Sequence, residues 1–351
     1  ATEFYRAHRE DMDDGAVVAW PERHSYDELS AIQHAMNLKL RDENAFFAEY
    51  QNDPAAMLND LDALPTTEDL MGRLSNVERG EVPLGAHKLT AFVDVQKAML
   101  FYVVIAWKDD FSGWVVDYGT WPDQRSRFFT LRDARYTLQR AFPESGLEGQ
   151  LFAGLEGLGK AIFNRSWCKS DGTEVTLERV GIDANWAEST ATVRQFCRES
   201  EWKRILMPCH GRAKAGAKVL GEASSRKKPG QARFGDNWRI SVISQQAHVT
   251  YDTNYWKSFA FNRLQTRPGD RGAVMLFGND EREHRQFCDQ LTSEYRVKVA
   301  VNGGPEMDQW KLYPGRENHW LDCFVGAHVM ASERYCQLGA AALPRWKKPK
   351  R

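Results

Sequence analysis

Several features that would assign a protein to a special class are scarce in this sequence. No run of apolar residues approaches the ~18 needed to cross a bilayer, so no membrane-spanning helix is expected. The first residues lack the basic-then-apolar pattern of a secretory signal. The six cysteines include no C-x-x-C pair, which argues against a zinc ribbon or a disulfide framework. We therefore expect a soluble cytoplasmic protein with free thiols.

An excess of charge of one sign is also missing. The formal net charge is −1, with 27% charged and 42% hydrophobic residues, as in ordinary globular proteins. This balance argues against a protein that coats DNA. Basic residues nevertheless gather in the Gly/Ser/Pro-rich stretch 212–233 and at the end of the chain. Such runs are most often solvated loops or tails, and the alternative is contact with a phosphate backbone, for which the candidates are Arg226, Lys227 and Lys228.

The pattern of the chain predicts three segments. Residues 1–85 read mainly as helix and linker, with helical spacing of apolar residues over 25–50. They carry too little apolar content to fold alone, and we expect them to join the rest of the chain to something upstream. Residues 86–345 are long enough for one large domain. Residues 346–351 form a basic C-terminal tail.

From residue 88 the sequence turns to strands. Three β-rich runs at 89–95, 99–107 and 114–118, with short connections, predict an antiparallel meander. Helices are then predicted at 130–141, 147–165, 187–199, 255–264, 281–295 and 321–335, and strands at 176–183, 204–208, 238–244 and 273–277. This order predicts an α/β fold in which helices flank a mixed sheet. It is the order of a ribonuclease-H-like fold, whose first and fourth strands are neighbours.

Three aspartates occupy positions that this topology would bring together. Asp94 comes near the end of the first strand, and Asp183 closes the fourth. Ligands commonly gather at the carboxyl ends of strands in open sheets. Asp322 shares an apolar stripe of the last helix with Val325 and Val329, so it is expected to face the sheet.

Clustered carboxylates of this kind suit two Mg²⁺ or Mn²⁺ ions that promote phosphodiester cleavage. Asp94, the most central, would bridge both ions. Each acid also has a simpler interpretation: Asp183 could begin a turn, and Asp322 could pair with Arg316 or a lysine. His319 is a weaker candidate for contacting phosphate or orienting water, with a structural role as the alternative. Asp117, at the end of the third strand, is a weak fourth acid.

One motif points elsewhere. Residues 154–160 match the G-x-x-x-x-G-K phosphate loop, but Ala161 replaces the Ser or Thr that would bind Mg²⁺. No strand precedes the motif, and residues 147–163 instead show the apolar spacing of an amphipathic helix. We therefore expect no ATP site in this chain.

Five runs of residues resemble a known family. They are residues 48–54, 93–96, 180–183, 252–257 and 310–322, the last reading WKLYPGRENHWLD. The sequence from about residue 20 to 335 is similar to the C-terminal nuclease domain of the terminase large subunit of tailed phages, lambda-type group. In that family an N-terminal ATPase motor drives DNA into the capsid, and a ribonuclease-H-like nuclease cuts the concatemer.

The resemblance implies a two-metal endonuclease that acts on double-stranded DNA, with Asp94, Asp183 and Asp322 as catalytic and metal-binding residues. It implies a small terminase subunit and a portal protein as partners, and the host cytoplasm as location. Residues 1–85 would be the tail of the motor domain, while the basic stretch 212–233 has no clear counterpart. The alternatives are a junction resolvase or transposase on the same fold, or a non-catalytic module that docks on portal or capsid protein.

Overall fold

The computed structural model describes residues 2–41, 64–213, 233–243, 246–300 and 306–338. The chain divides into two compact units, residues 1–63 and 64–351. The described part of the first unit holds helices α1 (Thr2–Ala7), α2 (Arg9–Asp13) and α3 (Ala31–Arg41). The Tyr5 hydroxyl ties them together, because it lies 2.6 Å from both Asp13 Oδ1 and Ser30 Oγ. Of the helix predicted over 25–50, the described portion starts at Ala31.

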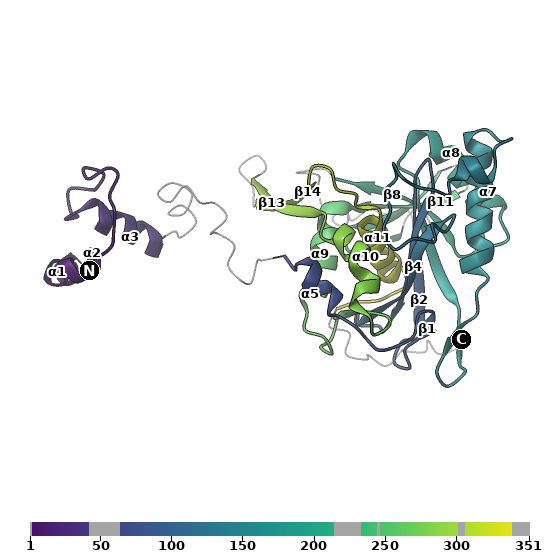
Figure 1. The fold of residues 1–351 in the computed structure, drawn as a ribbon, viewed down its shortest axis with the longest axis horizontal. Coiled ribbons are helices and arrows are strands. Elements are labelled where there is room, and N and C mark those ends of the chain that lie inside the picture. Colours follow the sequence, from purple (N-terminus) through teal and green to yellow (C-terminus); the bar gives the residue numbers. More distant parts are fainter. Residues whose placement is uncertain (1, 42–63, 214–232, 244–245, 301–305, 339–351) are drawn as a thin grey trace, which may run out of the picture. The chain divides into compact units, whose positions relative to one another are not determined.

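A nine-stranded mixed sheet forms the centre of the second unit, in the order β12-β4-β3-β2-β7-β8-β11-β10-β9 (Figure 1). Its strands are β2 (Lys88–Val95), β3 (Leu100–Trp107), β4 (Gly113–Trp121), β7 (Leu177–Asp183), β8 (Leu206–Arg212), β9 (Arg233–Gly235), β10 (Trp238–Ile243), β11 (Gln246–Asp252) and β12 (Val274–Leu276). There are two smaller sheets. One contains β1 (Glu81–Val82), β5 (Trp167–Lys169) and β6 (Glu174–Val175), and the other is the antiparallel pair of β13 (Glu294–Ala300) and β14 (Glu306–Leu312).

The strand pairing confirms the ribonuclease-H-like order. β2, β3 and β4 form the antiparallel meander, and β2 pairs in parallel with β7, the fourth strand of the predicted order. β8 then adds in parallel to β7. The register sets Val93 opposite Ile182. Asp94 and Asp183 are the next residues on the two strands, so they come together at the carboxyl ends.

Helices cover both faces of the sheet, and each face has its own apolar core (Figure 1). One layer contains α6 (Leu138–Ala141), α7 (Leu147–Leu158), the π-helical turn η3 (Gly159–Phe163) and α8 (Ala187–Glu199). The other contains α5 (Thr67–Met71), α9 (Thr253–Gln265), the 3-10 turn η4 (Glu281–His284), α10 (Arg285–Leu291) and α11 (His319–Glu333). The second unit is therefore a three-layer sandwich, as alternating strand and helix patterns favour.

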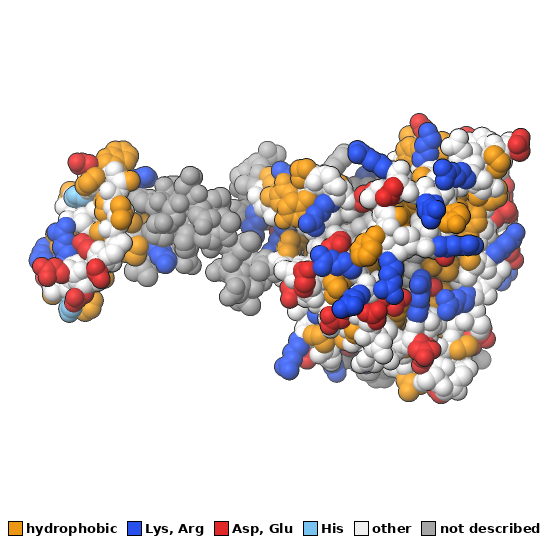
Figure 2. Space-filling view, viewed as in Figure 1, with side chains coloured by type: hydrophobic (Ala, Val, Ile, Leu, Met, Phe, Trp, Pro, Cys, Tyr) orange, Lys and Arg blue, Asp and Glu red, His pale blue; other side chains and the backbone are white. Residues whose placement is uncertain are grey.

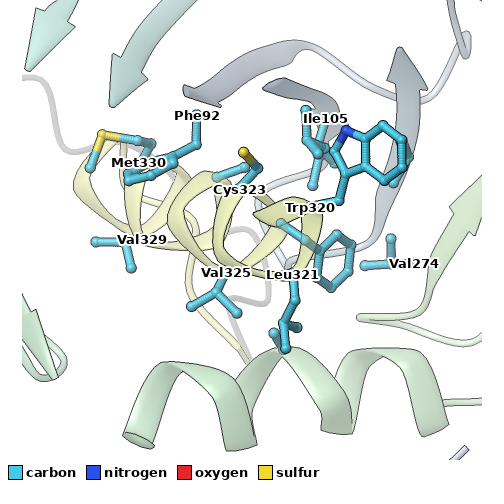
Figure 3. Packing of buried hydrophobic residues seen from close by; sticks show 14 of the residues in the cluster. Phe92, Ile105, Val274, Trp320, Leu321, Cys323, Val325, Val329 and Met330 are labelled. Atoms are coloured by element: carbon cyan, nitrogen blue, oxygen red, sulfur yellow. The ribbon is translucent and has the colours of Figure 1, made fainter. Parts of the chain in front are cut away.

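Side chains of β2 alternate between these cores. Leu89, Ala91 and Val93 belong to the core under α7 and α8, while Phe92 belongs to the core under α11. Figure 3 shows Phe92 and Cys323 between α11 and the strands, with Val325 on the other side of the helix. Asp94 is two residues beyond Phe92, so the same alternation directs it to the α11 side.

Several predicted elements differ from the structure in extent or type. Of residues 130–141 only Leu138–Ala141 is helical, because the Gln124 side chain binds the backbone of residues 135 and 136 and holds the preceding segment as a loop. The helix predicted at 281–295 ends at Leu291, and a strand begins at Glu294. The strand predicted at 204–208 begins at Leu206 and runs to Arg212. The sequence pattern did not predict strands β1, β5, β6, β9, β11, β13 and β14.

The helix predicted over residues 147–163 is confirmed. Residues 147–163 are helical throughout, and widen into a π-turn where Gly159 packs against Trp202. All six cysteines are free thiols. Among the described helices, none is long and apolar enough to cross a membrane.

Candidate active site

The ends of β2 and β7 and the first turn of α11 bring the three predicted aspartates to one edge of the sheet. Asp94 is 5% exposed, Asp183 is partly exposed, and the Asp322 side chain is 37% exposed. α11 can approach β2 closely because Gly326 has no side chain where it meets the ring of Phe92. The Thr90 hydroxyl adds a hydrogen bond of 2.9 Å to the carbonyl of Ala327. These contacts fix the start of α11 beside the end of β2.

The three carboxyl groups are close enough to repel one another. Burial, together with the negative charges of Asp94 and Asp322, raises the pKa of Asp183 to about 8. Desolvation of its carboxyl group and the charges of Asp94 and Glu294 outweigh the opposing charge of Lys257 and raise the pKa of Asp322 to about 6. An acidic cluster of this kind favours a bound proton or another cation.

Lys257 of α9 is one internal cation of the cluster. Its Nζ lies 2.5 Å from Glu294 Oε1 and 3.3 Å from Asp322 Oδ1. Burial lowers the pKa of Lys257, but the charges of Asp322 and Glu294 outweigh that effect and the net pKa is raised. The amide of Asn318 donates to the same Glu294 Oε1 at 2.7 Å. The alternative that Asp322 pairs with a lysine is thus realised, and the lysine is Lys257.

His319 faces Asp94. Its Nδ1 lies 2.8 Å from Asp94 Oδ2, and its ring stacks on Phe101 with centroids 4.5 Å apart. Burial lowers the pKa of His319, but the hydrogen bond and charge of Asp94 outweigh it, so the net pKa is raised. Gln96 donates to the same Asp94 oxygen at 2.9 Å. The position of His319 therefore suits orientation of Asp94, and its predicted contact with DNA stays a prediction.

The donor chemistry of the three acids fits a hard divalent cation, since carboxylate oxygens are the ligands that Mg²⁺ and Mn²⁺ prefer. The raised pKa of Asp183 means that its carboxylate is poorly stabilised at the carboxyl ends of β2 and β7, where a bound cation would stabilise it. Yet among the described residues no group of three or more His, Cys, Asp or Glu side chains is arranged so that it could hold a metal ion. The aspartates share one electrostatic environment, while Lys257 and His319 engage Asp322 and Asp94.

The remaining predicted residues lie elsewhere. Arg226, Lys227 and Lys228 fall outside the described residues. Asp117, the weak fourth acid, is 2% exposed, and its two oxygens accept from Arg79 at 2.7 Å and Arg165 at 3.0 Å. It acts as a buried structural anchor of β4.

Lys257 and Glu294 were not found by sequence reasoning. Glu294 was assigned to the end of a helix, and Lys257 to an ordinary helical segment. Their ion pair joins residues 37 positions apart, so no local spacing marks it. The one signal was that Lys257 ends the run 252–257, which contributed to the family resemblance.

The family model "Terminase large subunit gpA, endonuclease domain" matches residues 31–339 of the chain. The matched residues include strands β2 and β7, which carry Asp94 and Asp183, and helix α11, which carries Asp322. No curated protein and no solved structure matches the chain.

Proposed function

This chain belongs to the terminase large subunit gpA endonuclease-domain family, and we propose that it cuts double-stranded concatemeric DNA with the help of divalent metal ions. Membership of the family gives a nuclease role in phage DNA packaging. The metal requirement and the form of DNA that is cut belong to the proposal. The observation that carries it is the acidic cluster at the carboxyl ends of β2 and β7, where burial and neighbouring carboxylates raise the pKa of Asp183 to about 8.

Asp94, Asp183 and Asp322 are the residues that would hold two Mg²⁺ or Mn²⁺ ions. When bound, such ions lower the pKa of an attacking water and stabilise the leaving oxygen of a phosphodiester. His319 and Gln96 orient the Asp94 carboxylate through hydrogen bonds to Oδ2. Lys257 holds Asp322 on the side of Glu294 and offsets part of the negative charge that would repel DNA phosphates.

The partners follow from the family. Double-stranded DNA is the proposed substrate, and a small terminase subunit and a portal protein are the proposed partners of the full assembly. An ATPase motor is proposed to precede residues 1–85, while the chain itself is proposed to have no ATP site. A host-cytoplasmic location for assembly is part of the same proposal.

Plasmid cleavage tests the function directly. Supercoiled plasmid should be nicked and linearised in Mg²⁺ or Mn²⁺ and left intact in EDTA. Asp94→Asn should lower the cleavage rate by about 100-fold or more, because even residues that only orient metal ligands contribute about 10–100-fold. Asp270→Asn is the matched control, since Asp270 is an exposed acid in the turn between α9 and β12. Activity that survives Asp94→Asn at the wild-type rate would remove the assignment.

One observation favours a second candidate, a non-catalytic module that docks on portal or capsid protein. Asp322 already has a cation of its own, because Lys257 Nζ lies 3.3 Å away. Calorimetric titration with Mn²⁺ separates the two candidates. Binding that Asp183→Asn abolishes supports the nuclease, whereas no heat of binding and no rise in melting temperature would support the docking module.

A further inference from the structure

The connection between β4 and α6, residues 122–137, is rich in arginine, and we call it the arginine loop. Its four arginines are all exposed: Arg125, Arg127, Arg132 and Arg135. Its two acids are engaged by the backbone of the loop itself. Asp123 accepts from the Arg125 amide at 3.0 Å, and Asp133 accepts from the backbone and hydroxyl of Thr130. The loop therefore presents an excess of positive charge to solvent.

The arginine loop is held in place from inside. The Gln124 side chain is 2% exposed and accepts hydrogen bonds from the amides of Arg135 and Tyr136 at 3.0 and 3.2 Å. Gln286 of α10 also binds both backbone groups of Phe129. Because the loop is anchored at both these points, the backbone that carries its arginine side chains is held in place. Less conformational entropy is then lost when a ligand binds.

The same loop adjoins the candidate active site. The Leu131 amide donates to Glu317 Oε1 at 2.9 Å, two residues before His319. The Phe129 ring lies 6.4 Å from Phe101, the ring on which His319 stacks. A chain of direct contacts thus links the arginine loop to the residue that orients Asp94.

A cavity of about 870 Å³ opens between the arginine loop, α10 and the segment before α11, with Thr130, Arg132, Arg285 and Arg316 in its wall. Arg285 is bound to Glu68 and Asp289. Arg132 and Arg316 are exposed, and no acid partner is found for either guanidinium among the described residues. Figure 2 shows Lys and Arg side chains gathered on the face of the molecule that carries α10.

We propose that the arginine loop and Arg316 form a track for the phosphate backbone of the DNA that enters the nuclease site. This rests on the proposed function, because it names the surface that holds that substrate. An acidic cluster repels DNA, so a nuclease of this type needs positive charge beside its carboxylates. Arginine suits the task, since its guanidinium binds phosphate in a bidentate manner. Contacts of this class fix position and carry no sequence information.

Duplex binding in EDTA, measured by fluorescence anisotropy with a 30-base-pair probe, tests the track without cleavage. The triple variant Arg127→Ala, Arg132→Ala and Arg316→Ala should bind on the order of tenfold or more weakly at physiological salt. The slope of log affinity against log salt should fall by about 0.9 for each phosphate that the variant no longer binds. Both effects should be the same for unrelated sequences.

The matched control changes three basic residues at the opposite edge of the sheet: Arg198→Ala, Lys203→Ala and Arg204→Ala. Arg198 and Lys203 line a cavity of about 510 Å³ near Leu206, where β8 begins, whereas the aspartates lie at carboxyl ends. The control should keep wild-type affinity and salt slope. Equal melting temperatures of the variants exclude misfolding.

The outcomes for the track and for the nuclease are separable. If the triple variant binds like the wild type, or if the control loses as much affinity, the track is overturned. If the triple variant alone loses binding while wild-type protein cuts no plasmid with metal, the track stands and the proposed nuclease function fails. If wild-type protein binds no duplex, both are overturned.

Discussion

At the scale of single residues, the pKa of Asp183 is raised further than that of Asp322. Burial and the charges of Asp94 and Asp322 raise its pKa to about 8, from an ordinary value of 3.8. The folded protein therefore binds a proton at Asp183 more tightly than the unfolded chain does. The resulting stabilisation is fully present below the unfolded pKa and is lost as pH rises through the folded pKa. The raised pKa of Asp322, about 6, and that of His319 act in the same direction.

This linkage predicts how the melting temperature varies with pH in EDTA. The melting temperature should fall as pH rises from 5 to 9, by about 2–6 °C from Asp183 alone. Asp183→Asn should remove most of the fall between pH 6 and 9, and saturating Mg²⁺ should flatten it in the wild type. Differential scanning calorimetry in buffers of matched ionic strength measures both effects. Identical pH profiles for wild type and Asp183→Asn would contradict the electrostatic argument.

Sequence reasoning reached some of these residues and not others for a physical reason. Asp94 and Asp183 end or nearly end apolar strands, which is a local signal of a carboxyl-end site. The Lys257–Glu294 pair is formed between a helix and a hairpin strand, and nothing within either segment reports it. The pattern therefore predicts the acids, while Lys257, the cation that pairs with Asp322, emerges only with the tertiary structure. Whether the three acids bind metal stays a prediction.

At the scale of elements, the site depends on how closely α11 approaches β2. An added Cβ at Gly326 would lie 2.2 Å from the Phe92 ring, well inside van der Waals contact. The ring also rests on Gly181 of β7, so it cannot withdraw in that direction. The small residue at position 326 thus sets the distance between the start of α11 and the end of β2.

Gly326→Ala should therefore move α11 away from the sheet. We expect a loss of about 1–3 kcal/mol in the free energy of unfolding, as for other overpacked cores. Nuclease activity should fall further than stability explains, because Asp322 moves relative to Asp94 and small displacements of catalytic groups are costly. Urea unfolding and plasmid cleavage measure the two effects.

The rescue variant for this prediction is Gly326→Ala combined with Phe92→Leu, which removes the ring atoms that would clash. The double variant should be more active than the combined losses of Gly326→Ala and Phe92→Leu predict, because the effects of neighbouring substitutions are not additive. If Gly326→Ala is as active and stable as the wild type, the close approach does not control the site.

The elements that the sequence predicts well are those with continuous apolar runs. The three strands of the meander and the strand that ends at Asp183 were all found, since β2 and β3 are buried throughout and β4 and β7 are buried over most of their length. β11 was missed because its run mixes Gln246, His248 and Thr250 with apolar residues. The helix predicted at 281–295 ran too far because the apolar period continues past Leu291, where the chain turns into β13.

At the scale of the whole molecule, the contacts within each unit place the boundary between the two units at residue 63. The sequence pattern instead predicts that the linker ends at residue 85. Residues 64–85 are joined to the rest of the second unit by specific contacts. Thr67 Oγ1 donates to Asp289 at 3.0 Å, and Arg73 Nη2 donates to the Thr266 carbonyl at 2.7 Å. Arg79 is one of the two arginines that neutralise the buried Asp117.

Two fragments put these boundaries to the test. Fragment 64–351 should melt at the temperature of the second unit in the full chain and cut plasmid at the same rate, because every described contact of the candidate site lies within it. Fragment 86–351 should lose about 3–5 kcal/mol of unfolding free energy, since Asp117 then keeps only Arg165 as a partner and a buried charge is left partly uncompensated. Urea denaturation of both fragments decides between the boundaries. Equal stability of the two would show that residues 64–85 are the linker that the sequence pattern predicts, and that their ion pair with β4 contributes little.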